Sequence, residues 1–299
     1  MEGILIPCQG RIVTIETNLR EFLFTARDFQ RARKLIHEHA GISLSDSKQE
    51  LVYARLSRRL RATGMNSFTD YLARLEEGDD LEWQAFANSL TTNLTAFFRE
   101  AHHFPILAEH LRKQDGKQPS ILWCSASSTG EEPYSMAMTA VEAFESFSPP
   151  VTIIATDLDT NVLETARKGV YPVAQLDKLG TARLKRFFLR GTGSHAGFAK
   201  VRPELQRMIT FRRLNLLDRC WAIREPLDAI FCRNVMIYFD KQTQLSILKR
   251  FTPLLNEDGL LFAGHSENFF HADELFRSRG KTVYELAPAI KAGISGRAR

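Results

Sequence analysis

The chain has 299 residues, 44% of them apolar, and a formal net charge of +5, which is typical of an ordinary water-soluble globular protein with room for about two domains. No stretch is long and apolar enough to span a bilayer, and residues 1–10 lack the pattern of a secretory signal, so we expect a cytoplasmic protein without membrane insertion. The four cysteines form no CxxC pair, which argues against a structural zinc site and indicates a reducing compartment.

Residues 24–113 show helical spacing of apolar side chains, and no strand-like alternation interrupts them. We therefore predict an all-helical N-terminal domain over residues 20–92. Four cations fall within one sector of about 100° on the helix expected at 47–62: Lys48, Arg55, Arg58 and Arg59. This arginine face is either a solvated surface or a docking surface for an acidic partner, and the pattern alone does not decide between the two.

From residue 120 the pattern changes to short apolar strands separated by helical segments. The strand candidates are 121–125, 151–157, 227–233 and 260–264. The alternation predicts an α/β fold with a doubly wound parallel sheet, in a domain that we place at residues 93–287. A further run at 282–287 alternates and is expected to pair antiparallel at one side of the sheet. Residues 288–299 are expected to form a flexible tail.

Residues 187–213 fit neither pattern, because they combine several glycines with short β-like pieces. We expect a small antiparallel β-subdomain inserted in the sheet domain. Its exposed edge can accept an extended peptide as an added strand, with Arg190 and Arg202 available to receive acidic groups. The alternative is an insert that only packs on the sheet.

The strand expected at 151–157 ends in Asp157, placed like the carboxylate that accepts hydrogen bonds from ribose hydroxyls in nucleotide-binding folds. NAD enzymes and S-adenosylmethionine enzymes share this geometry. The loop after the preceding strand has a single glycine, Gly130, followed by Glu131 and Glu132 where a pyrophosphate would need backbone amides. Carboxylates suit the cationic S-adenosylmethionine, and Glu131 is the expected contact. The glutamate pair also has a structural interpretation, because acidic residues stabilise a helix N-terminus.

The strand expected at 227–233 ends in Arg233 and Asn234, and Tyr238 and Phe239 follow shortly afterwards. In open α/β sheets, ligands collect at the carboxyl ends of the strands. The sequence therefore predicts a polar reaction site at this edge, beside the bound cofactor.

Six motifs are spread along the chain: TTNLTAFFRE (91–100), ASSTGEEPYS (126–135), RGTG (190–193), NLL (215–217), FCRNVMIYF (231–239) and LLFAGHSEN (260–268). In this order and at similar spacing they occur in the CheR family of chemotaxis receptor methyltransferases, which the chain resembles from about residue 25 to about residue 287. The resemblance implies a helical N-terminal domain, a Rossmann-like S-adenosylmethionine domain with a small antiparallel subdomain, and methyl esterification of chemoreceptor glutamates. It also implies that the subdomain tethers a receptor's C-terminal peptide in those family members that use a tether.

Carried over position by position, the resemblance implies these cofactor contacts: Asn93, Thr95, Arg99, Glu131, Asp157, Asn215, Leu216, Arg233 and Asn234. The residues by themselves point only to Glu131, Asp157 and the Arg233–Asn234 pair. Without the resemblance, Asn93 and Thr95 would be interpreted as helix caps. One departure is Ser127, where the family commonly has alanine; a small residue is kept, so we expect cofactor binding to persist.

The chemistry implied by the resemblance needs no general base. A glutamate side chain, with a reference pKa of about 4.3, is already ionised at neutral pH and can attack a sulfonium methyl directly. The site must instead align oxygen, methyl and sulfur in a water-poor pocket. Arg99 is the candidate to orient the carboxylate and Tyr238 the candidate to hydrogen-bond near the transferring group, although both are also compatible with packing or surface roles.

The motifs also bear on three alternatives: a nucleic-acid methyltransferase, a module that only senses S-adenosylmethionine, and a metal site. A nucleic-acid methyltransferase would use the arginine face on phosphates, but an amino-group methylase carries an Asn-Pro-Pro-Tyr type motif and this strand ends Arg-Asn-Val-Met, so we expect no nucleic-acid partner. A module that senses S-adenosylmethionine without turnover stays open, because cofactor contacts do not prove catalysis. His102 and His103 show no cysteine or carboxylate partner at ligand spacing, so we expect no metal.

Overall fold

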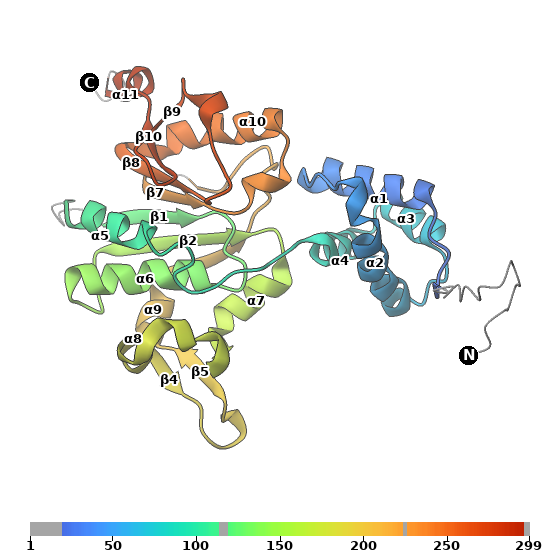
Figure 1. Cartoon of the computed structure of the whole chain (residues 1–299), viewed down its shortest axis with the longest axis horizontal. Helices are drawn as coiled ribbons and strands as arrows, with labels where there is room; N and C mark the ends of the chain where they lie inside the picture. Colours follow the sequence, from blue (N-terminus) through green and yellow to red (C-terminus); the bar gives the residue numbers. More distant parts are fainter. Residues whose placement is uncertain (1–19, 114–118, 224–225, 296–299) are drawn as a thin grey trace, which may run out of the picture.

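The computed structural model describes residues 20–113, 119–223 and 226–295. Its N-terminal domain consists of helices (Figure 1). They are α1 (Ala26–Ala40), α2 (Gln49–Thr63), α3 (Phe68–Glu76) and α4 (Asp80–Leu90), with a 3-10 turn, η1 (Asp46–Lys48), before α2. Thr25 and Asp28 form a capping box at the start of α1, and Gly41 ends this helix in the left-handed conformation. The predicted all-helical domain is confirmed.

The core of this domain contains apolar side chains spaced three and four residues apart, such as the fully buried Leu56 and Leu60 of α2. Among the described residues of this domain, the carboxylates of Asp28 and Glu82 are also buried. Glu82 of α4 is buried, pairs with Arg59 (Nη2 to Oε2, 2.8 Å) and accepts the Tyr71 hydroxyl at 2.7 Å. The charge of Glu82 is therefore compensated inside the domain by α2 and α3.

A seven-stranded sheet with the order β6-β2-β1-β7-β8-β10-β9 forms the centre of the second domain. Its strands are β1 (Ser120–Cys124), β2 (Val151–Asp157), β6 (Ile209–Arg213), β7 (Leu227–Cys232), β8 (Leu255–Ala263), β9 (Phe276–Ser278) and β10 (Val283–Leu286). The first five strands in this order run parallel, while β10 pairs antiparallel with β8 and β9. The predicted parallel sheet and its antiparallel last strand are confirmed.

Two apolar layers cover the sheet, because neighbouring side chains on each strand point to opposite faces. Leu122 of β1 belongs to the layer with α5 (His103–Lys113) and α6 (Glu131–Phe144), whereas Trp123 belongs to the layer with α10 (Lys241–Phe251). α7 (Thr160–Lys168) contacts β2 and β6. Within the three described stretches, every helix is too short or too polar to cross a membrane.

The flexible tail predicted for residues 288–299 is wrong over its first part. Residues Pro288–Ser295 form α11, which contacts β8. Ile290 packs against the apolar layer of α10, and its backbone N–H donates to the Ala287 carbonyl at 2.9 Å. Two isoleucines, at positions 290 and 294, among mostly small residues form too short a periodic pattern to predict such a helix. Residues 296–299 lie outside the described part of the chain, as does Cys8.

A second, three-stranded antiparallel sheet has the order β3-β5-β4, and α8 (Gly180–Phe187) and α9 (Pro203–Arg207) accompany it. Its strands are β3 (Val170–Pro172), β4 (Phe188–Arg190) and β5 (Phe198–Val201). The predicted range 187–213 is therefore displaced. It misses β3, and its last residues form β6, which pairs parallel with β2 in the large sheet. A short β-like run carries no information about which of two sheets it joins.

Candidate functional site

A cavity of about 470 Å³ opens at the carboxyl ends of β1, β2 and β7. Both domains line it. The helical domain contributes the segment after α1, from Ala40 to Ser45, together with Lys48 and Leu51 of η1 and α2. The sheet domain contributes the loops after its central strands. Most of the predicted site residues line this cavity: Asn93, Thr95, Arg99, Asp157, Asn215, Leu216, Arg233, Asn234 and Tyr238.

Asp157 ends β2 and is held by backbone amides. Its Oδ2 accepts from the Ser128 N–H at 2.8 Å and its Oδ1 accepts from the Asp159 N–H at 3.0 Å. Burial raises the pKa of Asp157 to about 6, although the two amides act in the opposite direction. Each carboxylate oxygen has a second lone pair, so Asp157 can still accept hydroxyl groups from the cavity.

Glu132, and not the predicted Glu131, lines the cavity. Glu131 is also buried, but its carboxylate accepts the Thr129 hydroxyl at 2.6 Å. Glu132 accepts from Arg233 at 2.8 Å and from the Cys124 thiol at 3.3 Å. Burial raises the pKa of Glu132, and the charge of Arg233 opposes this shift. Of the two glutamates, the structure therefore places the second one, Glu132, in the lining of the cavity.

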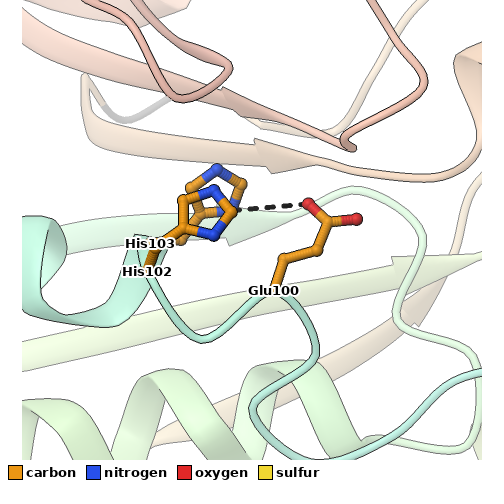
Figure 2. Close-up of side chains that lie close together, drawn as sticks. All are labelled: Glu100, His102 and His103. Atoms are coloured by element: carbon orange, nitrogen blue, oxygen red, sulfur yellow. Dashed lines mark ion pairs between the residues drawn. The ribbon is translucent and has the colours of Figure 1, made fainter.

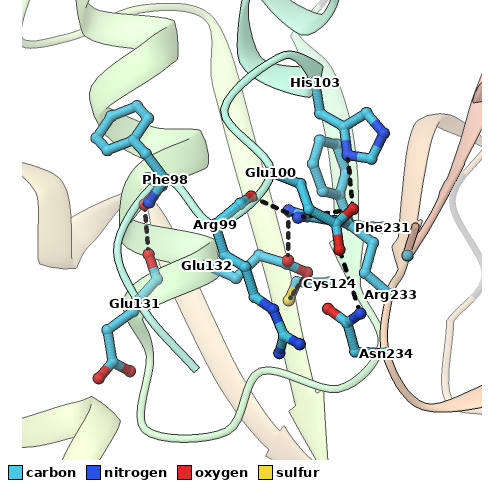
Figure 3. Close-up of polar contacts among 12 residues, drawn as sticks. Phe98, Arg99, Glu100, His103, Cys124, Glu131, Glu132, Phe231, Arg233 and Asn234 are labelled. Atoms are coloured by element: carbon cyan, nitrogen blue, oxygen red, sulfur yellow. Dashed lines mark hydrogen bonds and ion pairs between the residues drawn. The ribbon is translucent and has the colours of Figure 1, made fainter. Parts of the chain in front are cut away.

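Arg233 has a fully buried guanidinium that joins three parts of the site (Figure 3). Its Nη1 donates to Glu132 of α6, and its Nη2 donates to the backbone carbonyl of Arg99 at 2.5 Å. The same Nη2 lies 3.4 Å from Glu100 Oε2. Through its contacts with Arg99 and Glu100, Arg233 holds the end of the 93–100 segment against the sheet. Loss of Arg233 would leave buried negative charge without its cation.

Several non-glycine residues around the cavity have left-handed backbone conformations: Phe98, Glu100, Ser128 and Asn234, with φ between 47° and 56°. Ser128 and Asn234 line the cavity, and the other two flank Arg99, which also lines it. Such conformations are strained and persist only where surrounding contacts impose them. Their concentration here is typical of a functional site.

Glu100, His102 and His103 lie together, with candidate ligand atoms within 4.8 Å of one another (Figure 2). The prediction that the histidines lack a carboxylate neighbour is therefore wrong, because Glu100 supplies one. Burial and the charge of Arg233 lower the pKa of His103 to about 4. Burial acts to raise the pKa of Glu100, but hydrogen bonds from His265 and the charge of Arg233 outweigh it and lower the pKa to about 2. A potential that opposes a proton on His103 also opposes a metal cation, so we assign no metal to this cluster.

The segment between α4 and α5 crosses from one domain to the other and carries Asn93 and Thr95. Neither residue starts a helix. The Asn93 side chain donates to Asp159 at 2.8 Å, and its carbonyl accepts the Ser128 hydroxyl at 2.9 Å. The Arg99 guanidinium donates to the Leu94 carbonyl at 2.9 Å. These bonds fix the segment as one wall of the cavity.

Asn215 and Tyr238 tie the opposite wall to the helical domain. The Asn215 side chain donates to the His39 carbonyl at 2.7 Å, and the Tyr238 carbonyl accepts from the Ser43 N–H at 2.9 Å. We call the segment of the helical domain from His39 to Ser45 the roof of the cavity. Sequence reasoning missed it, because contacts between this segment and residues far along the chain leave no local pattern. It also missed Glu267, whose carboxylate accepts backbone amides near Asn234.

The predicted arginine face on α2 divides into three different environments. Arg58 is exposed. Arg55 is partly buried and donates to the Thr91 carbonyl at 2.6 Å. Arg59 makes two hydrogen bonds to the buried Glu82, at 3.0 and 2.8 Å, so it is engaged inside the domain. A sector defined by helical angle does not distinguish an arginine that faces solvent from one that has a buried partner.

Arg190 and Arg202 lie on the small sheet and do not line the cavity. Arg190 ends β4 and is exposed, and Arg202 follows β5 and is half-buried. The backbone N–H of Arg202 donates to the Phe187 carbonyl at 2.9 Å. The structure therefore separates these two arginines from the other predicted site residues.

Comparison with known proteins agrees with this geometry. The family model described as "CheR methyltransferase, SAM binding domain" matches residues 93–285, and "CheR methyltransferase, all-alpha domain" matches residues 27–91. The chain is 55% identical over 269 residues to chemotaxis protein methyltransferase 2 of Pseudomonas aeruginosa, covering 90% of this chain and 96% of the relative. It is 51% identical over 283 residues to the chemotaxis protein methyltransferase of Escherichia coli, covering 94% and 98%. The chain belongs to the CheR methyltransferase family, and its cofactor is S-adenosylmethionine.

Proposed function

We propose that the chain transfers a methyl group from S-adenosylmethionine to glutamate side chains of chemoreceptors, forming γ-methyl esters. The observation that carries this proposal is a cavity lined by both domains, in which buried carboxylates and the carboxylate-orienting candidate Arg99 lie together. Its volume of about 470 Å³ lies within the usual range for a site that encloses a cofactor-sized molecule. Chemoreceptor cytoplasmic domains are the acceptors, so we place the activity in the cytoplasm.

The residues of the cavity fit this cofactor. Asp157 offers free lone pairs for ribose hydroxyls, and Glu132 offers a negative charge for a cationic group. We assign the adenine to the Asn215–Leu216 side and the amino-acid end to the side of Arg233 and Asn234. When bound, the cofactor supplies an electrophilic methyl on a sulfonium. All remaining contributions come from the protein's own side chains.

The acceptor carboxylate is already ionised and needs no general base. The site must orient it and remove its water. The guanidinium of Arg99 lines the cavity and matches a carboxylate bidentately. Lys48 lines the cavity from the helical domain and is exposed, so it adds a positive charge where an anionic side chain would enter. Tyr238 is half-buried in the same wall and can donate a hydrogen bond beside the transferring group. The negative charge of the carboxylate and the positive charge of the sulfonium both diminish in the transition state, so a pocket that excludes water would lower the barrier.

Two surfaces are proposed to contact the receptor. Arg58 and Lys48 are exposed cations of α2 and η1, on the domain that roofs the cavity, and they suit acidic helices. Arg55 supports this face by holding the Thr91 carbonyl, while Arg59 is engaged with Glu82. The proposed receptor-binding face therefore contains two of the four predicted cations, Lys48 and Arg58.

The small sheet is the proposed tether for a receptor C-terminal peptide. The order β3-β5-β4 leaves β4 at an edge, where Leu189 is 43% exposed and Arg190 is exposed. An extended peptide can add to this edge, with Arg190 and Arg202 near its acidic groups. Tethering would raise the effective concentration of distant glutamates without new contacts in the cavity.

Radiolabelled methyl transfer to receptor-containing membranes tests the proposed activity. Mild alkali releases volatile methanol from methyl esters, so alkali-labile label is the expected result. Alkali-stable label would indicate nitrogen or nucleic-acid acceptors and contradict the proposal. Binding of S-adenosylmethionine without any label would favour a cofactor-sensing module.

A further inference from the structure

We propose that Glu267 is a positioning residue for methyl transfer: its buried carboxylate holds the turn Arg233–Tyr238 against the cavity without touching cofactor or acceptor. The proposal rests on the proposed methyl transfer and adds a residue that is not among those lining the cavity. Glu267 follows β8 in the LLFAGHSEN motif and is 5% exposed.

Three backbone amides converge on this one carboxylate. Oε2 accepts from the N–H of Asn234 at 3.0 Å and from the N–H of Gly264 at 2.5 Å, and Oε1 accepts from the N–H of Met236 at 2.8 Å. Among the residues that the structure describes, no Lys, Arg or His forms an ion pair with Glu267, so oriented N–H groups stabilise its charge. Burial raises the pKa of Glu267, and the amides of Gly264, Asn234 and Met236 act against this shift.

The turn needs this support because its own conformation is strained. Asn234 has φ of 56°, a left-handed conformation that residues other than glycine adopt only where surrounding contacts hold them in it. The amides of Asn234 and Met236 flank Val235 and point to the same carboxylate, so Glu267 defines the path of the chain between them. That path sets where Arg233 and Tyr238 enter the cavity.

Gly264 gives an independent indication that the two loops are built against each other. A Cβ atom at this position would lie 2.9 Å from both the Asn234 backbone nitrogen and Glu267 Oε2. Such contacts are too short for a carbon atom, so only glycine allows the loop after β8 to approach the turn after β7 this closely.

The substitution Glu267→Gln tests the inference. Glutamine keeps one oxygen and replaces the other with an N–H₂ donor, so at least one of the three amides loses its acceptor. We expect kcat to fall by about tenfold to a hundredfold, the usual range for a residue that orients others. KM for the receptor should change by less than about twofold, because the acceptor does not contact Glu267. Amide hydrogen exchange at Asn234 and Met236 should accelerate.

Asp228→Asn is the matched control. Asp228 is 6% exposed and accepts the Ile121 N–H and the Asn256 side chain, both at 2.8 Å, at the opposite end of β7. This variant should lower the melting temperature but keep kcat. An unchanged kcat in folded Glu267→Gln, or an equal loss of kcat in Asp228→Asn, would overturn the inference.

Failure of the proposed function gives a different result, since the wild-type protein would then yield no alkali-labile label. Hydrogen exchange decides in that case. Faster exchange at Asn234 and Met236 in Glu267→Gln, but not in Asp228→Asn, would still support the positioning role. Unchanged exchange at both amides would overturn it.

Discussion

The backbone N–H of Ser43 donates to the carbonyl of Tyr238 across 2.9 Å, and this bond joins the helical domain to the wall that carries the proposed reaction site. A few residues away, the Asn215 side chain donates to the carbonyl of His39 at 2.7 Å. The end of α1 and the segment after it thus cover the cavity, held by their backbone groups. The helical domain therefore lines the cavity that we propose for the cofactor, in addition to any role in docking.

Gly41 allows this roof to approach the sheet domain, and Gly41→Ala should disturb it. Its φ is 68°, and an added Cβ would lie 2.9 Å from Leu217 Cδ1 and from Phe239 Cδ1. The left-handed conformation alone should cost alanine about 1–2 kcal/mol of stability. Overpacking should add about 1–3 kcal/mol and weaken cofactor binding, as measured by denaturant unfolding and calorimetric titration.

Gly64→Ala separates these two effects. Gly64 ends α2 with φ of 69°, and a Cβ added there would point into open space. Gly64→Ala should lower the stability only by the cost of the left-handed conformation, and it should bind S-adenosylmethionine normally. Equal losses of cofactor affinity in both variants would contradict a role of the roof in binding.

Asp157 should make cofactor affinity depend on pH. Burial raises its pKa to about 6, so the carboxylate that we propose to accept ribose hydroxyls is protonated below this pH and ionised above it. Affinity should therefore rise with pH up to about 6 and level off above it, falling at most about tenfold per unit on the acid side. Titrations between pH 5 and 8 measure this dependence.

The variant Asp157→Asn isolates the contribution of Asp157. Glu132 lies in the same cavity and also has a raised pKa, because it is buried. If Asp157 is responsible, the asparagine variant should bind more weakly at neutral pH and lose the rise near pH 6. A rise that survives unchanged in this variant would point to Glu132.

Arg233→Met should be among the most destabilising single changes in the sheet domain. It leaves Glu132 and Glu100 buried without their cation, and such a loss typically costs about 3–5 kcal/mol. Arg31→Met is the control, since Arg31 also forms an ion pair, a bidentate one with Glu76, but both of these side chains are partly exposed. Its cost should stay near 1 kcal/mol or below. Denaturant unfolding measures the free energy of unfolding of both variants. Similar losses in Arg233→Met and Arg31→Met would contradict the prediction.

Sequence reasoning located Asp157 and the Arg233–Asn234 pair because strand direction alone brings the ends of parallel strands to one edge. It chose Glu131 over Glu132 because two consecutive residues at a helix start point about 100° apart, and the rotation of α6 against the sheet is not encoded locally. The ion pair of Arg59 with Glu82 was equally hidden, because it depends on how α2 and α4 pack. Periodicity predicts elements well, but it does not predict how they are rotated against one another.

Arg58 and Arg59 are neighbours in sequence and should behave differently when changed to alanine. Arg58 is exposed, so Arg58→Ala should raise KM for receptor, more strongly at low salt, and leave stability and cofactor affinity near normal. Arg59→Ala leaves the buried Glu82 carboxylate without its cation and should lower the free energy of unfolding by about 3 kcal/mol. Adding Glu82→Gln should recover part of that loss.

Arg279, an exposed residue that follows β9 in the large sheet, supplies the charge-matched control. Arg279→Ala removes the same charge away from α2 and from the small sheet, and it should leave KM for receptor unchanged. An equal rise of KM in Arg58→Ala and Arg279→Ala would indicate a general effect of net charge and not a docking face. If Arg59→Ala raised KM for receptor more than Arg58→Ala and left the free energy of unfolding unchanged, Arg59 would be a receptor contact, and its ion pair with Glu82 would not stabilise the domain.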